Sequence, residues 1–239
     1  MDAQCLVSWL DELDSNGCLG VGFGGGEPTL FPKFAEVCRY AAHSTGLAVS
    51  FTTNGQHLDD ALMCALAGSV HFVRVSMDGV GPTYEALRGR PFATLRACLQ
   101  NVRALSPFGL NYVVNSRTLA DLDAATSFAA DMGATEFLLL PEQPACGSGG
   151  IDGRTVHALC RWVCAYRGIV PLTVSEAGAE GLPTCNPIPR ETGLRAYAHI
   201  DAAGMLKESS YKRWGVPIGP AGVMAALTLL RQRQMEGSQ

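Results

Sequence analysis

Short apolar runs alternate with amphipathic segments along most of the chain. Runs of four to seven residues rich in Val, Leu, Ile or Phe, bounded by Gly, Asn, Asp or Pro, are typical of buried strands. They occupy residues 19–23, 48–52, 72–76, 110–114, 136–140 and, more weakly, 170–174. Between them, apolar residues recur every three or four positions, which predicts helices. These helices cover residues 32–45, 59–67, 94–105, 118–132 and 155–166, and an earlier helix carries Leu6, Trp9, Leu10 and Leu13.

The order of these elements predicts the fold class. A helix followed by five or six strand–helix units indicates an α/β fold with a parallel sheet, either doubly wound or a barrel. A complete eight-unit barrel needs roughly 250 residues, so a partial barrel fits the visible units better. Thr118, with Asp121 three residues later, is expected to cap the helix that follows, and Gly133 is expected to end it.

The pattern changes after about residue 184. Residues 197–201 and 205–211 alternate around the turn Ala202-Ala203-Gly204, which predicts a β-hairpin. An amphipathic helix is expected over residues 220–234. We therefore expect two parts, a partial barrel over residues 1–175 and a hairpin-and-helix extension over residues 176–239.

Composition narrows the class of protein. Of the 239 residues, 47% are hydrophobic and 17% charged, which argues against a disordered chain. The net charge is −4 and no basic run occurs, so we expect neither a nucleic-acid partner nor a membrane partner. The first residues lack the basic and apolar segments of a secretory signal, which makes a cytoplasmic protein the expectation.

The chain has nine cysteines, an odd number that does not suit a closed disulfide framework. None of them forms a C-x-x-C pair. In the cytosol such cysteines are free, metal-bound or redox-active more often than paired in disulfides. Cys38, Cys64 and Cys98, and the pair Cys160 and Cys164, lie in amphipathic segments and are interpreted as core residues.

Polar or glycine-rich sequences follow the strands, where ligands bind in parallel α/β folds. In order they are Gly24-Gly25-Gly26-Glu27-Pro28, Thr53-Asn54-Gly55, Ser76-Met77-Asp78-Gly79, Asn115-Ser116-Arg117 and Pro141-Glu142-Gln143-Pro144. Each segment taken singly is also typical of a simple turn. The ordered series, with one segment per strand end, favours a shared binding site.

The residue types indicate the ligand. The glycine carbonyls and the Glu27 carboxylate only accept hydrogen bonds, so they suit a cationic donor such as an amine and would repel a phosphate. Ser76 and Asp78 can accept from sugar hydroxyls, and Arg88 can pair with a carboxylate. One ligand with an amine, a carboxylate and a ribose would satisfy all of these groups.

These motifs resemble those of the radical S-adenosylmethionine (radical SAM) superfamily. The resemblance rests on Gly25-Gly26-Glu27-Pro28, Thr53-Asn54-Gly55, and Ser76-Met77-Asp78-Gly79 with Tyr84 and Arg88-Gly89 after it, and it extends to about Pro144. It implies a partial (β/α)6 TIM-type barrel. It also implies a [4Fe–4S] cluster and S-adenosylmethionine as cofactors, the cluster's open iron holding the amine and carboxylate of the latter. Members generate a 5′-deoxyadenosyl radical that abstracts a substrate hydrogen.

The resemblance also implies roles for individual residues. Gly25, Gly26 and Glu27, with Pro28 completing the motif, would hold the methionine amine. Ser76 and Asp78 would face the ribose or the carboxylate, and Arg88 would face the methionine carboxylate. Asn115 would reach the ribose, residues 138–141 would lie near the adenine, and Thr53 and Asn54 would complete the pocket.

The chain departs from the family pattern at the cluster. The family motif C-x-x-x-C-x-x-C precedes the Gly-Gly-Glu-Pro strand, but only Cys5 and Cys18 do so here. Three thiolates and one open iron are required. We therefore expect the first strand and the cluster ligands to be absent from this chain, and a partner chain to cover the open barrel edge.

The C-terminal part resembles the auxiliary-cluster extension of peptide-modifying family members. The resemblance rests on Cys185, the hairpin around Gly204, and residues 215–219. Ser209 and Ser210 stand where a further cysteine is usual, so Cys185 is only a candidate auxiliary ligand. Cys146, Cys160 and Cys164 could join it, and His199 is interpreted as a hydrogen-bonded hairpin residue rather than a ligand.

The expected function follows from the resemblance and leaves alternatives open. The first hypothesis is an S-adenosylmethionine-binding barrel that, in a full-length form, modifies a peptide or a small molecule by radical chemistry. The second is a non-catalytic, truncated member that acts as a binding or partner protein. The third is an iron-free α/β enzyme or ligand-binding module that uses Glu27, Asp78, Arg88 and Asn115.

Overall fold

The computed structural model describes residues 2–144, 149–175, 182 and 192–236. The chain divides into two compact units. Unit 1 consists of Met1–Ser50, Gly68–Val70 and Asn186–Gln239, and unit 2 of Phe51–Ala67 and His71–Cys185. The expected division at residue 175 follows the sequence pattern, whereas these units reflect spatial contacts.

Strands and helices alternate as the hydrophobic pattern predicts. The strands are β1 (Gly20–Phe23), β2 (Ala48–Thr53), β3 (Phe72–Ser76), β4 (Phe108–Val114), β5 (Glu136–Pro141), β6 (Leu172–Val174), β7 (His199–Ile200), β8 (Met205–Lys207) and β9 (Val216–Pro217). The α-helices are α1 (Ala3–Ser15), α2 (Phe34–Ser44), α3 (Asp60–Leu66), α4 (Pro82–Arg88), α5 (Phe92–Leu105), α6 (Leu122–Met132), α7 (Gly153–Ala165) and α8 (Gly222–Glu236). Short 3-10 helices are η1 (Pro28–Leu30), η2 (Leu119–Asp121) and η3 (Gly193–Arg195).

The first six strands form one sheet in the order β1-β2-β3-β4-β5-β6, and a second sheet has the order β7-β8-β9. In unit 2, β3, β4, β5 and β6 pair in parallel, which confirms the predicted α/β class. The first sheet is open, as in a partial barrel, since β1 and β6 are the two ends of its order.

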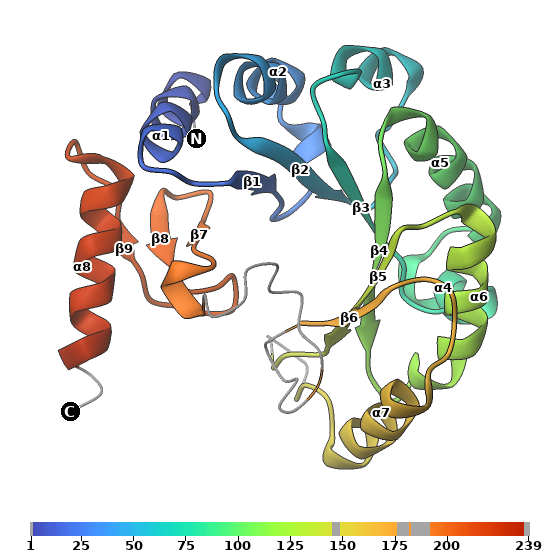
Figure 1. Cartoon of the computed structure of the whole chain (residues 1–239). Helices are drawn as coiled ribbons and strands as arrows, with labels where there is room; N and C mark the ends of the chain where they lie inside the picture. Colours follow the sequence, from blue (N-terminus) through green and yellow to red (C-terminus); the bar gives the residue numbers. More distant parts are fainter. Residues whose placement is uncertain (1, 145–148, 176–181, 183–191, 237–239) are drawn as a thin grey trace. The chain divides into compact units, whose positions relative to one another are not determined.

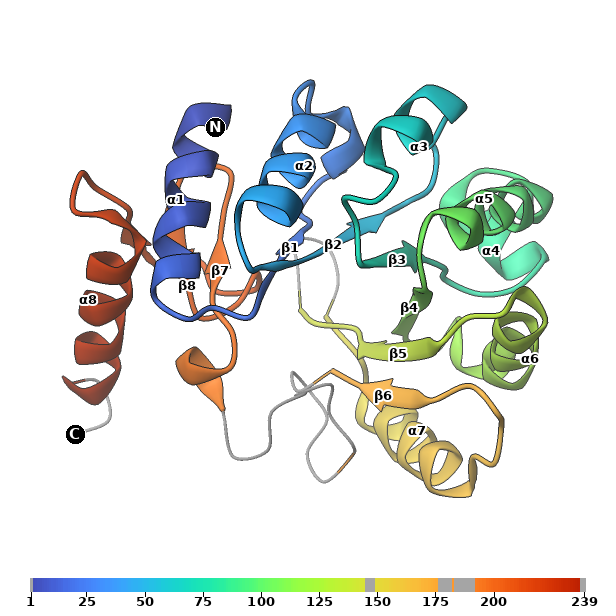
Figure 2. The ribbon, with the colours of Figure 1, turned by 45° about the horizontal axis from the view of Figure 1, so that its top comes forward.

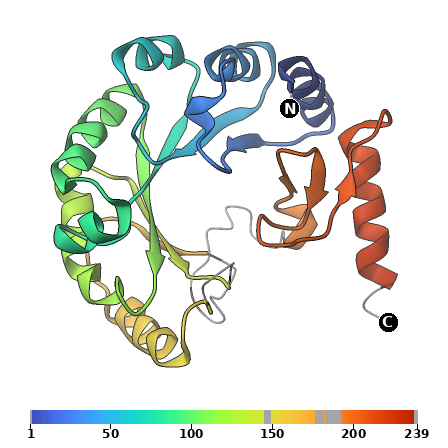
Figure 3. The same ribbon diagram turned by 180° about the vertical axis from the view of Figure 1, so that it is seen from behind.

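In unit 2 the helices α4 to α7 lie along one side of strands β3 to β6, in views from the front and from behind (Figures 1 and 3). Alternate strand residues are fully buried, such as Val73 and Val75 on β3 and Tyr112 on β4. The residues between them, including Arg74 and Ser76, are half-buried. This alternation gives unit 2 an apolar face beneath its helices and a polar face on the other side of the sheet.

In unit 1 the predicted hairpin is confirmed, since β7 and β8 pair antiparallel. The third strand, β9, was not predicted, and it pairs with β8. Helices α1 and α8 lie side by side (Figures 1 and 2). Their shared core contains buried Leu206, Val216 and Leu230, with Trp9 of α1 packed against it.

Several local expectations are corrected. Thr118 makes no side-chain cap to the helix, which begins at Leu122 after the 3-10 turn η2. Gly133 does end this helix, with a left-handed φ of 80°. Cys38 and Cys98 are buried as predicted, but Cys64 and Cys164 are exposed. In the described part of the chain, no helix combines the length and the apolar character needed to cross a membrane.

Candidate functional site

The ten predicted ligand-binding residues are divided between the units. Gly25, Gly26, Glu27 and Pro28 belong to unit 1, and Thr53, Asn54, Ser76, Asp78, Arg88 and Asn115 belong to unit 2. Apart from Arg88, the last residue of α4, these residues lie at or directly after strand ends of the open sheet, as the sequence predicts. Each group has its own set of local contacts within its unit.

In unit 1 the glycine-rich segment follows β1 and leads into η1. The Phe23 ring packs edge-on against Phe34 of α2, with centroids 5.9 Å apart, which fixes the end of the strand. Glu27 is the N-cap of η1, and its Oε1 accepts hydrogen bonds from the Thr29 hydroxyl at 2.7 Å and the Thr29 N–H at 3.4 Å. A Cβ placed on Gly25 or Gly26 would meet no described atom within 4 Å, so the backbone here is open to a ligand.

In unit 2 the end of β3 is joined to α4 by an ion pair. Arg88 Nη2 lies 2.6 Å from Asp78 Oδ2, and the two side chains are 27% and 17% exposed. The other Asp78 oxygen accepts from Val113 N–H of β4 at 3.1 Å. Asp78 thus orients Arg88 and links it to β3 and β4, and a guanidinium is a group that can also bind a carboxylate.

A second arginine, Arg90, holds the end of β2. Its Nη2 donates to the carbonyl of Asn54, and its guanidinium lies over the ring of Tyr84, 5.5 Å from the centroid. Asn54 Oδ1 accepts from Gln56 N–H at 2.8 Å, and Thr53 Oγ1 accepts from Gly55 N–H at 3.0 Å. The segment after β2 is therefore a turn fixed by its own side chains and by Arg90.

The loop after β4 is organised by Thr118, a buried residue that was predicted only as a cap. Its hydroxyl donates to the Val113 carbonyl at 2.7 Å and accepts from Asn115 N–H at 3.0 Å. Asn115 Oδ1 accepts from the N–H groups of Arg117 and Thr118 at 2.9 and 3.2 Å. The oxygen of Asn115 is thus used within the loop, and its amide nitrogen remains the group suited to a ribose hydroxyl.

The polar face of the unit 2 sheet carries a second ion pair. Arg74 Nη2 contacts both Glu136 oxygens, at 2.8 and 2.6 Å, and the Thr173 hydroxyl donates to Glu136 Oε1 at 3.0 Å. Gly109 lies between Arg74 and Glu136 in the strand register. Ser76 lies two residues after Arg74 on β3, closer to the carboxyl end of the strand, and it is paired with Asn111 of β4.

Three of these contributors were not predicted from the sequence. Arg90 and Thr118 carried no assigned role in the site, and Asp121, whose carboxylate accepts from Val80 N–H at 3.0 Å, was predicted only as part of a helix start. The signal that could have found Arg90 is its spacing of two residues from Arg88 in Arg88-Gly89-Arg90.

An iron–sulfur cluster does not fit the described residues. Among them, no group of three or more His, Cys, Asp and Glu side chains is arranged to hold a metal ion. Burial raises the pKa of the Cys38 thiol to about 12, which suits a core residue and not a thiolate ligand. Cys146 and Cys185 lie outside the described residues. His199 accepts or donates a 3.4 Å hydrogen bond with the Tyr197 hydroxyl, as a hairpin residue would.

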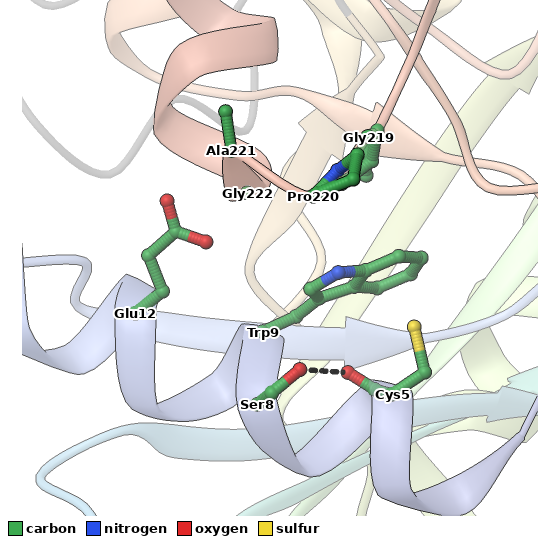
Figure 4. A pocket seen from close by; sticks show the side chains of 9 residues that line it. Cys5, Ser8, Trp9, Glu12, Gly219, Pro220, Ala221 and Gly222 are labelled. Carbon is green, nitrogen blue, oxygen red and sulfur yellow. Dashed lines mark hydrogen bonds between the residues drawn. The ribbon is translucent and has the colours of Figure 1, made fainter.

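Unit 1 also contains an open cavity of about 540 Å³ between α1 and the loop before α8. Trp9 and Glu12 face this loop, and Cys5 lies beside Trp9 (Figure 4). The residues that line the cavity include none of those predicted to bind S-adenosylmethionine.

The model of the radical SAM superfamily matches residues 1–125, more than half of the chain. The chain belongs to the radical SAM superfamily. The matched range contains all ten predicted ligand-binding residues.

Curated relatives share a limited part of their length with this chain. Mycofactocin maturase MftC of Mycobacterium tuberculosis is 36% identical over 132 residues, covering 53% of this chain and 33% of the relative. PqqA peptide cyclase of Ruegeria pomeroyi is 31% identical over 139 residues, covering 56% of this chain and 37% of the relative. The chain thus spans about a third of the length of these two relatives.

Solved structures support the fold. SuiB of Streptococcus suis gives a TM-score of 0.70 at 15% identity, covering 90% of this chain and 56% of SuiB. The structure of anSMEcpe with bound AdoMet gives a TM-score of 0.68 at 14% identity, covering 98% of this chain and 73% of anSMEcpe. At this level of identity the likeness concerns the fold alone, and it confirms the expected similarity to radical SAM partial barrels.

Proposed function

We propose that this chain binds S-adenosylmethionine at the carboxyl ends of its strands, as part of a radical SAM protein that modifies a peptide or a small molecule. One observation carries the proposal: the family match contains every residue whose chemistry, read from the sequence, asks for an amine, a carboxylate and a ribose. The chemistry supplied by bound S-adenosylmethionine in this family is a 5′-deoxyadenosyl radical.

The described residues have separate parts in this proposal. The open backbone at Gly25 and Gly26 and the Glu27 carboxylate accept hydrogen bonds from the methionine amine. Arg88, oriented by Asp78, pairs with the methionine carboxylate. Ser76 and the Asn115 amide nitrogen meet the ribose, and the end of β5 lies along the adenine.

The relatives favour a peptide as the substrate class. One is named a peptide cyclase, and SuiB has been solved bound to its precursor peptide SuiA. Because the chain covers 56% or less of these proteins, the substrate remains part of our proposal rather than a property carried over from them.

A second candidate is a non-catalytic member that binds S-adenosylmethionine or a partner chain. It is favoured by the lack of a metal-holding side-chain group in the described part of the chain. In this candidate the residues at the strand ends bind and orient the ligand, and no radical forms on this chain.

Anaerobic reconstitution with iron and sulfide separates the two candidates. The non-catalytic candidate predicts bound iron far below four per chain and no band near 400 nm. Reconstitution to about four irons per chain with that band would favour the catalytic candidate, since a full [4Fe–4S] cluster requires a set of thiolate ligands. Calorimetric titration with S-adenosylmethionine tests the binding step that both candidates share.

A further inference from the structure

Arg90 joins the end of α4 to the end of β2, a strand end that the proposed pocket uses. It is half-buried, and it donates to the Asn54 carbonyl at the end of β2. Its guanidinium lies over the Tyr84 ring, 5.5 Å from the centroid, within the range of a cation–π contact. No carboxylate partner of Arg90 occurs among the ion pairs of the described residues. Among the described residues Arg90 contacts a carbonyl and a ring, whereas an arginine that is taken out of solvent is usually paired with an opposite charge.

The support beneath Arg90 is rigid. Tyr84 is fully buried in α4, and its ring packs edge-on against Phe92 at 5.3 Å. Phe92 in turn packs against Phe128 of α6 at 4.7 Å. Arg90 therefore rests on a ring that belongs to the core of unit 2, and the Asn54 carbonyl is fixed relative to that core.

Arg88 and Arg90 leave the end of α4 towards different strands. The helix ends at Gly89, whose φ of 65° is left-handed and turns the chain sharply. Arg88 pairs with Asp78 after β3, whereas Arg90 reaches Asn54 after β2. The Arg90 guanidinium also lies over the ring of Tyr84, a residue of the same helix as Arg88. One helix end thus sets the spacing of two loops.

We propose that Arg90 is a positioning residue for the methionine end of S-adenosylmethionine. This inference rests on the proposed function. Arg90 ties the loop after β2 to the end of α4 through the Asn54 carbonyl, and Arg88 lies at that same helix end, so Arg90 holds the Asn54 loop at a set place relative to the Arg88 guanidinium that would pair with the methionine carboxylate. The adenine, assigned to the end of β5, lies outside this arrangement. We expect lysine not to replace Arg90, because a lysine ammonium is a compact point charge, whereas the guanidinium of Arg90 donates to a carbonyl while it lies over a ring.

The test compares two ligands by isothermal titration calorimetry. S-adenosylmethionine carries the methionine amine and carboxylate, whereas 5′-methylthioadenosine lacks both and keeps the adenosine. We expect Arg90→Lys and Arg90→Met to weaken S-adenosylmethionine binding about tenfold, the loss of roughly one well-placed hydrogen bond. Binding of 5′-methylthioadenosine should stay within about twofold of the wild type, a difference too small to reflect a lost contact.

Arg96 offers a matched control. Its guanidinium lies 5.1 Å from the centroid of the Phe128 ring, the same kind of contact in the same unit, but it touches no predicted ligand-binding residue. Arg96→Met should leave the affinities for both ligands unchanged. Unfolding midpoints of all variants, measured without ligand, show whether each one folds, and Arg90→Lys decides the question if Arg90→Met does not fold.

Three results would overturn the inference. The first is an equal loss of affinity for both ligands, which would indicate general damage to the fold. The second is an unchanged affinity of Arg90→Met for S-adenosylmethionine. The third is a wild-type affinity of Arg90→Lys for S-adenosylmethionine. Failure of the proposed function looks different, because the wild type itself would then bind neither ligand, and the inference would fall with it.

Discussion

Glu12 of α1 accepts a hydrogen bond from the backbone N–H of Val223, in the first turn of α8, at 2.7 Å. Its second oxygen accepts from Met224 N–H at 2.8 Å. The first N–H groups of a helix have no partner within it, and a carboxylate there also meets the positive end of the helix dipole. Gly222 leaves room for this carboxylate, because a Cβ at that position would collide with the Glu12 oxygens. Glu12 of α1 thus caps the first turn of α8.

Replacing Glu12 with alanine should lower the free energy of unfolding by about 1–2 kcal/mol, the usual loss for a helix cap. Urea-induced unfolding measures this change. Gln4→Ala, at an exposed position of the same helix, should change the free energy by less than about 0.5 kcal/mol. Equal effects of the two substitutions would show that the cap does not stabilise unit 1.

The ion pair between Asp78 and Arg88 should couple the two residues energetically. Because both side chains are less than a third exposed, a double-mutant cycle with Asp78→Asn and Arg88→Met should give a coupling of about 1 kcal/mol or more. The free energies come from urea-induced unfolding of the wild type, both single variants and the double variant. Additive effects would contradict the pairing.

Two glycines with left-handed backbone should differ in their tolerance of alanine. Gly25 and Gly55 have φ of 88° and 76°, but only at Gly55 would a Cβ meet another side chain, Cys98 Sγ at 2.5 Å. We expect Gly25→Ala to cost about 1–2 kcal/mol from backbone strain alone, and Gly55→Ala to cost at least about 1 kcal/mol more, as overpacking does.

The contribution of Cys98 can be separated in the same measurement. Cys98→Ala should recover part of the loss in Gly55→Ala and none of the loss in Gly25→Ala. If Cys98→Ala helped both or neither, the contact between Cys98 and position 55 would not be the cause.

The stability of unit 1 should depend on pH through His199. Burial lowers the pKa of His199 below 6.5 in the folded chain, so the unfolded chain binds this proton more readily. The stability that unit 1 gains from keeping His199 neutral is therefore fully present above pH 6.5. It is lost as the pH falls through the lowered pKa of His199 in the folded chain. Asp201 does not contribute to this pH dependence near neutral pH, because its hydrogen bond with Lys207 lowers its pKa from 3.8.

The measurement is the difference in unfolding free energy between about pH 7.5 and about pH 5.5, which bracket the usual histidine pKa. His199→Gln should show a smaller loss than the wild type over this range. An identical loss in both proteins would show that His199 is not the titrating group.

The local pattern of apolar and turn residues predicted most strands and helices. It failed for the elements that depend on contacts with distant parts of the chain. The strands from β1 to β6 fall within a few residues of their predicted places, since alternation and turn residues are local signals. Helix α4 was missed because Gly79 and Gly81 before it are typical of turns. The two-residue strand β9 was missed because a ladder with β8, not its own sequence, defines it.

The candidate site was likewise predicted where local signals suffice and missed where contacts between distant residues decide. The residue types at strand ends predicted the ligand chemistry, but not the partners that orient them. The pairing of Asp78 with Arg88 depends on the unpredicted helix α4, and the cap between Glu12 and Val223 joins residues 211 positions apart. No periodicity carries such information. Cys64 and Cys164 were placed in the core on helical spacing, yet both are exposed.

Calorimetric titration of the wild-type chain with S-adenosylmethionine tests the central claim most directly. We expect saturable binding of one ligand per chain, weakened about tenfold or more by Glu27→Ala and by Arg88→Met, since each removes a charged hydrogen-bonding partner. The absence of binding heat for the wild type, or affinities in both variants equal to that of the wild type, would contradict it.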